Sequence, residues 1–150
     1  MRRSTTIPLV TGQALTGTLT EIGTAGNARI RVMNADFITV LVDYTRGGAA
    51  GVPIFKLEFN NTADTGQDPA TITTGWYGVP VLDSSTFAVG NMEQFAASVT
   101  AQPSAAGPYR VAFGPFSGAS GSFARVLLAD TDAGTPGTVT VGYFEAVGGP

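Results

Sequence analysis

The sequence predicts an all-β fold, a single antiparallel β-sandwich for which an eight-stranded jelly roll is the favoured topology. About eight or nine short segments alternate apolar and polar residues, and Gly, Pro, Asn and Asp separate them. The chain has no Cys, so it lacks the paired cysteines around a tryptophan that mark immunoglobulin domains. Its 150 residues fit one domain. We expect residues 1–6 to form a flexible, basic N-terminal arm and residues 7–150 to form the sandwich.

The first part of the chain predicts three short strands, at residues 7–10, 15–21 and 28–34. Ile30 and Val32 point to one face of the third strand because their spacing is two residues. Arg29 and Arg31 point to the opposite face. We expect these two arginines to lie on an exposed or subunit-facing surface of the sheet.

The longest β signal is a predicted hairpin. Its strands, residues 38–45 and 55–60, each place alternate apolar side chains on one face. The connection between them is rich in glycine, and we expect Gly47, Gly48 and Gly51 to supply positive φ angles for a tight turn. The hairpin carries no recognisable catalytic residues. This favours a structural role for the protein.

Beyond the hairpin, a polar loop over residues 60–70 precedes further strands. The segment 87–99 is ambiguous, because residues 92–97 suit one helical turn while Gly90 limits its length. The remaining strands are expected at residues 71–77, 79–82, 109–113, 123–129 and 138–147. The predicted core consists of apolar residues that face inward from the strands: Ile38, Val40, Val42, Phe55, Leu57, Phe59, Val111, Val126, Leu128, Val139 and Val141.

The composition argues against several function classes. The chain has no His and no Cys, so Ser–His and Cys–His nucleophilic devices, disulfides and ordinary His/Cys zinc sites are excluded. Its net charge of −3 argues against a nucleic-acid partner, because phosphate binding requires clustered cations. No apolar run approaches the ~20 residues that cross a bilayer, and we recognise no secretion signal. We therefore expect no membrane association.

Two loops rich in carboxylate and amide oxygens, Asn60–Asp68 and Asp130–Gly134, offer ligands of the kind that Ca²⁺ prefers. The second loop lacks the distal glutamate of an EF-hand loop. Asp and Asn also terminate strands and build Asx turns, and we favour that interpretation for both loops.

Two residue pairs are candidates for a catalytic or a sugar-binding site. Glu58 and Glu145 lie on predicted strands, and two opposed acids are the device of glycoside hydrolysis. However, Glu58 alternates with Lys56, which is typical of a solvated strand face. Trp76 and Tyr77 suit sugar stacking, but adjacent residues of a strand point to opposite faces and cannot form one platform. We expect no catalysis and no essential cofactor, since the carboxylates are scattered over turns.

Five segments in order form a recognisable pattern. They are Leu41–Thr45, Phe55–Asn60, Trp76–Tyr77, Phe123–Leu128 and Thr138–Val141. In this pattern the chain resembles a group of small jelly-roll structural proteins of tailed-bacteriophage virions. Members of that group commonly combine a strand ending in Val-Asp-Tyr-Thr, an apolar strand ending in Glu-Phe-Asn or Glu-Phe-Ser, and a Trp after a loop. The resemblance covers roughly residues 36–147, and the loop before the Trp is longer here than in the group's pattern.

The resemblance implies a capsid decoration, or cementing, protein that binds the outer face of a phage head and stabilises it, or a related head or tail accessory protein. Its partner would be the major capsid protein, its assembly a homo-oligomer and specifically a trimer, and its location the virion after synthesis in the host cytoplasm. Arg2 and Arg3 of the arm would then contact acidic groups of the shell. The alternative is a carbohydrate- or receptor-binding β-sandwich module of a phage tail or fibre, which would use Trp76 or the Asn60–Asp68 loop.

Overall fold

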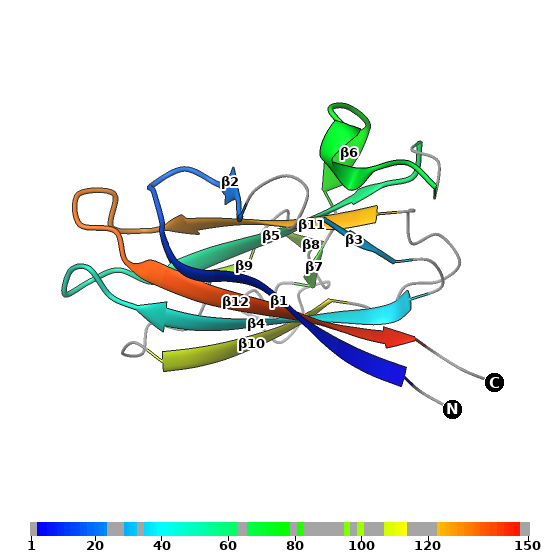
Figure 1. The fold of residues 1–150 in the computed structure, drawn as a ribbon. Helices are drawn as coiled ribbons and strands as arrows, with labels where there is room; N and C mark the ends of the chain where they lie inside the picture. Colours follow the sequence, from blue (N-terminus) through cyan, green and yellow to red (C-terminus); the bar gives the residue numbers. More distant parts are fainter. Residues whose placement is uncertain are drawn as a thin grey trace, which may run out of the picture.

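The structure is a computed structural model of the chain. It describes residues 3–23, 29–32, 35–62, 66–78, 81–82, 95–96, 99–100, 107–113 and 123–147. Two antiparallel sheets form a sandwich, with β12, β1, β4 and β10 in one layer and β11, β5 and β2 in the other (Figure 1). The predicted all-β sandwich is therefore confirmed.

The first sheet has four strands in the order β1-β12-β4-β10. Their bounds are β1 (Arg3–Ala14), β12 (Thr138–Val147), β4 (Ala35–Thr45) and β10 (Gly107–Phe113). The second sheet has the order β2-β11-β5-β6, with β3 also paired to β11 and β9 to β5. Its bounds are β2 (Thr20–Glu21), β11 (Phe123–Asp130), β5 (Pro53–Asn60), β6 (Trp76–Gly78), β3 (Arg29–Arg31) and β9 (Val99–Thr100).

Three short elements complete the described structure. β7 (Val81–Leu82) and β8 (Phe95–Ala96) pair with each other, and a 3₁₀ turn, η1, spans Pro69–Thr71. The first strand of the chain, β1, pairs with the last, β12, and the successive long strands from β4 onward alternate between the two sheets. This arrangement is compatible with an eight-stranded jelly roll, in which two Greek keys are wrapped across two sheets.

The core lies between the two sheets, as the alternation predicts. Val40 and Val42 of β4 are buried against the inward residues of β5 and β11. Ten of the eleven predicted core residues are buried, namely all of them except Val111, whose side chain lies outside the described set. Tyr44 joins them although it is polar, because its hydroxyl group has a buried hydrogen-bond partner.

The predicted hairpin is wrong as a pairing, although both of its strands exist. β4 pairs with β12 and β10, whereas β5 pairs with β11 in the other sheet. The connection over residues 46–52 therefore crosses from one sheet to the other. Period-two alternation gives each strand a buried face, and two strands on facing sheets satisfy this requirement as well as two neighbours do.

The glycines of this connection allow close packing and do not provide a tight turn. None of Gly47, Gly48 and Gly51 has a positive φ angle. A Cβ atom on Gly51 would lie 2.6 Å from Asp130 Oδ1 and 2.7 Å from the Tyr44 hydroxyl oxygen. Any side chain at Gly51 would thus displace the buried hydrogen bond between these two residues.

The N-terminal arm expected over residues 1–6 also requires correction. β1 already begins at Arg3, and residues 3–6 pair with β12 over Phe144–Val147. Ladder hydrogen bonds to a long neighbouring strand order this segment despite its polar sequence. Met1 and Arg2 lie outside the described residues.

Three shorter elements also differ from the elements expected from the sequence. Of the strand expected over residues 15–21, only Thr20–Glu21 is a strand. The strand expected from Thr71 begins at Trp76, because η1 occupies the first positions. The helical turn expected near residue 92 is replaced at Phe95–Ala96 by β8, and the rest of that segment lies outside the described residues.

Candidate functional site

On the outer face of the six-stranded sheet, ion pairs join five charged side chains, here called the charged row: Glu21, Arg29, Lys56, Glu58 and Arg125. The register of the sheet places them together. Arg125 on β11 lies directly opposite Arg29 on one side and opposite Glu58 on the other. Residues directly opposite one another share a face, and the alternation that buries Leu57 turns Glu58 outward.

Arg125 is the centre of the charged row. Its guanidinium group lies 2.7 Å from the Glu58 carboxylate and 3.0 Å from the Glu21 carboxylate. Arg29 binds Glu21 with two parallel hydrogen bonds of 2.7 and 3.0 Å, and Lys56 Nζ lies 2.9 Å from Glu58 Oε1. Each carboxylate thus lies between two cations. The Glu58 residue is only 7% exposed, so the interpretation of a solvated strand face is wrong.

Trp76 packs against the charged row. The Arg125 and Arg29 guanidinium carbons lie 4.4 and 5.2 Å from the centre of its ring. These are cation–π contacts, in which the ring face attracts a positive charge. Tyr77 points to the other face of β6, where it meets Phe59 edge-on at 6.4 Å and remains 40% exposed. The two rings do not form one platform, as the strand geometry predicts.

The charged row also anchors the segment over residues 66–76. Arg29 Nη1 donates hydrogen bonds to the carbonyl oxygens of Pro69 and Ile72 at 2.8 and 2.7 Å. The Trp76 indole N–H donates to the same Ile72 carbonyl at 3.4 Å. Asp68 caps η1 by accepting a hydrogen bond from the Ala70 N–H at 3.0 Å. In Figure 1 this segment, in green, stands out from the six-stranded sheet on the side away from the other sheet.

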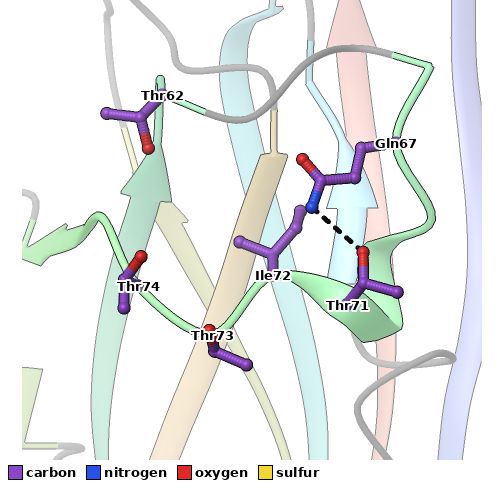
Figure 2. A pocket seen from close by; sticks show the side chains of 6 residues that line it. All are labelled: Thr62, Gln67, Thr71, Ile72, Thr73 and Thr74. Carbon is purple, nitrogen blue, oxygen red and sulfur yellow. Dashed lines mark hydrogen bonds between the residues drawn. The ribbon is translucent and has the colours of Figure 1, made fainter.

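Between this segment and the end of β5 lies a polar depression of about 250 Å³. Figure 2 shows its lining: Thr62, Gln67, Thr71, Ile72, Thr73 and Thr74. Five of these side chains carry hydroxyl or amide groups, and none carries a charge. The Asn60–Asp68 loop therefore contributes Thr62 and Gln67 to a neutral polar hollow that lies next to Trp76.

The Asp130–Gly134 loop is built by turn chemistry. Asp130 is 1% exposed, and its carboxylate accepts hydrogen bonds from the Tyr44 hydroxyl, the Asp132 N–H and the Gly137 N–H at 2.7–2.8 Å. Asp132 accepts two backbone N–H bonds and the Thr135 hydroxyl bond. Since protein donors occupy both carboxylates, the Asx-turn interpretation holds here. Among the described residues, no three Asp or Glu side chains converge as metal ligands.

The structure separates the other predicted site residues. Glu58 and Glu145 lie on strands of different sheets, and Glu58 faces away from the opposite sheet. The side chains of Arg3 and Glu145 lie outside the described set, as does the whole of Arg2. The charged row was not predicted from the sequence because its members come from four strands, and Arg125 is 67 and 104 residues away from its partners Glu58 and Glu21.

Glu58 gives the site a pH dependence. Burial alone would raise the pKa of its carboxyl group, but hydrogen bonds from Lys56 and Arg125 outweigh burial and hold the pKa below its ordinary value. A carboxyl group whose pKa is lower in the folded state stabilises the fold above its unfolded-state pKa. That stability is lost as the pH falls through the folded-state pKa.

We therefore expect Glu58→Gln to lower the free energy of unfolding by about 2 kcal/mol at neutral pH, with a smaller difference in acid. Urea unfolding of both proteins between about pH 7 and about pH 3 measures this. Asp43→Asn, which removes an exposed carboxylate from β4, is the control and should change stability by less than about 0.5 kcal/mol. A Glu58→Gln difference that is constant over this range would contradict the assignment.

Comparisons of the chain with protein-family models, with curated proteins and with solved structures find no match. In the described part of the chain, no helix has the length and apolar character needed to cross a membrane.

Proposed function

We propose that this chain is a structural virion protein, a decoration protein that binds the outer face of a phage head and stabilises it. It acts without catalysis and as a homo-oligomer, specifically a trimer. Its partner is the major capsid protein, with no role for nucleic acid or a membrane. The proposal includes the jelly-roll topology, with which the observed strand order is compatible.

One observation carries this proposal. The five segments that resemble phage virion proteins fall on β4, β5, β6, β11 and β12. Four of these strands, β4, β12, β5 and β11, lie at the centre of the two sheets, so the resemblance follows the framework of the sandwich. The resemblance thus concerns the scaffold, which is the part that a structural protein uses.

The charges support a binding role over a catalytic one. Glu21 and Glu58 each lie between two cations, so neither is held as a free acid or base. Charged residues make up 13% of the chain, well below the usual ~25%. A weakly charged surface allows copies to stand close together on a shell with little repulsion. Arg2 and Arg3, at the beginning of the chain, are proposed to contact acidic groups of the shell protein.

The test mixes the purified protein with mature, undecorated phage capsids. We expect saturable binding and capsids that resist heat or denaturant better, because a ligand that binds only the assembled lattice stabilises it by mass action. Sedimentation measures binding, and release of packaged DNA on heating measures stability. Immature capsids serve as the control. Absence of binding, or binding without any gain in capsid stability, would refute the decoration role.

The second candidate function is binding of a carbohydrate or a receptor by a tail or fibre module. The observation that favours it is the neutral polar depression beside Trp76. Genes next to this one also separate the candidates, since shell, portal or protease genes favour decoration and fibre genes favour a receptor-binding module.

A further inference from the structure

The depression between β5 and the segment 66–76 has a fixed shape. Asn60 is 0% exposed and ties its two sides together. The Asn60 side-chain oxygen Oδ1 accepts hydrogen bonds from the Thr62 N–H and the Thr62 hydroxyl at 3.0 and 3.2 Å. Its amide group donates to the Thr74 carbonyl oxygen at 2.6 Å. One buried side chain therefore sets the separation of Thr62 and Thr74 across the hollow.

Hydrogen bonds to the backbone of Ile72 hold the floor of the depression in place. Ile72 is 3% exposed, and its carbonyl oxygen accepts hydrogen bonds from both Arg29 and Trp76. Arg29 has a side chain only 8% exposed and is itself bound to Glu21. The charged row thus holds the segment from which Thr73 and Thr74 project. A binding surface that is already ordered loses less entropy when a ligand binds.

The polar groups on the rim remain available to a ligand. The hydroxyl groups of Thr73 and Thr74 make no hydrogen bond to another residue in the described part of the chain, and both residues are exposed. The side-chain amide of Gln67 donates to the Thr71 hydroxyl at 3.0 Å through Nε2, and its side-chain oxygen Oε1 accepts no hydrogen bond from the described part of the chain (Figure 2). Hydroxyl and amide groups both donate and accept hydrogen bonds, which matches a ligand with the same ability.

The lining selects the chemical class of that ligand. None of the lining side chains in the described part of the chain carries a charge, so this lining offers no counter-charge to an anion or a cation. Ile72 is the one apolar side chain among the described lining residues, which is too little for a hydrophobic ligand. A neutral compound with several hydroxyl groups fits both observations, and sugars are compounds of this class.

We propose that this depression binds a neutral sugar unit through Gln67, Thr73 and Thr74. Trp76 acts as a positioning residue that holds the floor, and its ring contacts Arg125 and Arg29. The inference rests on the second candidate function and names its site. It is independent of the decoration role, because binding to a capsid does not require this hollow.

The test measures binding of neutral mono- and oligosaccharides to the full chain by saturation-transfer NMR and on a glycan array. We expect binding by the wild-type chain. The double variant Thr73→Val, Thr74→Val should bind at least about tenfold more weakly, because two hydrogen bonds are lost while side-chain shape is kept. Thr138→Val, an exposed threonine of β12 in the other sheet, is the matched control and should bind like the wild type.

The outcomes separate the site from the function. If the wild-type chain binds no neutral sugar, the proposed site is refuted, and the second candidate function is refuted with it only if the array shows no binding to any glycan and the chain binds no receptor. If it binds a sugar and the double variant binds equally well, the function stands and this site is refuted. Binding restricted to charged glycans would refute the ligand class. Thermal unfolding of each variant within about 2 °C of the wild type shows that the fold is retained.

Discussion

Replacing Asp130 by alanine is expected to have the largest effect on stability, a loss of about 3–5 kcal/mol in the free energy of unfolding. The Asp130 carboxylate accepts bonds from the Tyr44 hydroxyl and from the Asp132 and Gly137 N–H groups. The first and last of these bonds are buried, so the substitution removes a charged acceptor from two buried donors. Scanning calorimetry should show a decrease in Tm of about 10 °C.

Two further variants control this expectation. Tyr44→Phe removes one donor and leaves the other two bonds of Asp130, so it should cost about 1 kcal/mol. Asp132→Ala removes a carboxylate that caps the same loop through solvent-exposed bonds, and it should cost much less than Asp130→Ala. If Asp130→Ala costs no more than Asp132→Ala, the buried carboxylate does not hold the two sheets together at this end.

The strands and the core were predictable because both follow from a local pattern. Alternation alone identified the buried faces of β4, β5, β11 and β12, and it requires only that neighbours in sequence point to opposite sides. Asp130 was also visible as a turn residue, since Asp-Thr-Asp-Ala-Gly is a common loop sequence. Its burial was not visible, because Tyr44 lies 86 residues away in the chain.

Strand partners could not be predicted by the same means. β4 and β5 are consecutive, and a hairpin is the simplest connection, but alternation fixes only the face that a strand buries and not its neighbour. The charged row could not be predicted from the sequence, for the same reason. Arg125 meets Glu58 and Glu21 across sequence separations of 67 and 104 residues, so no local pattern links them.

The segment that lines the polar depression was partly indicated by the sequence. The run Thr71-Ile-Thr-Thr74 alternates weakly and suggested a strand, but Asp68 and Pro69 start a 3₁₀ turn there instead. Capping by Asp68 and the fixed φ angle of Pro69 favour that turn over a strand. The turn then lets Arg29 reach the carbonyl oxygens of Pro69 and Ile72.

Replacing Arg29 by lysine is expected to have the second-largest effect, about 2–3 kcal/mol in the free energy of unfolding. Arg29 makes two bonds to Glu21 and two to the carbonyl oxygens of Pro69 and Ile72 from one rigid group. Lysine has three donors on one nitrogen and cannot reproduce this geometry. Hydrogen exchange should also accelerate at the Thr71 and Ile72 amides, whose bonds close η1.

Arg31→Lys is the matched control, because Arg31 lies two residues along the same strand and points to the same face. Arg31 is exposed, its bond to the Gln67 backbone carbonyl oxygen is 3.2 Å long, and its cation–π contact with Phe123 at 5.6 Å is of a kind that lysine also makes, so the substitution should cost less than about 1 kcal/mol. If Arg29 anchors the segment 66–76, Arg29→Lys will accelerate exchange there more than in the core of β5. Equal effects of the two substitutions, or exchange that changes uniformly over the sheet, would show that the segment is held by other contacts. Retained sugar binding in Arg29→Lys, with the segment released, would in turn remove Arg29 from the support of the depression.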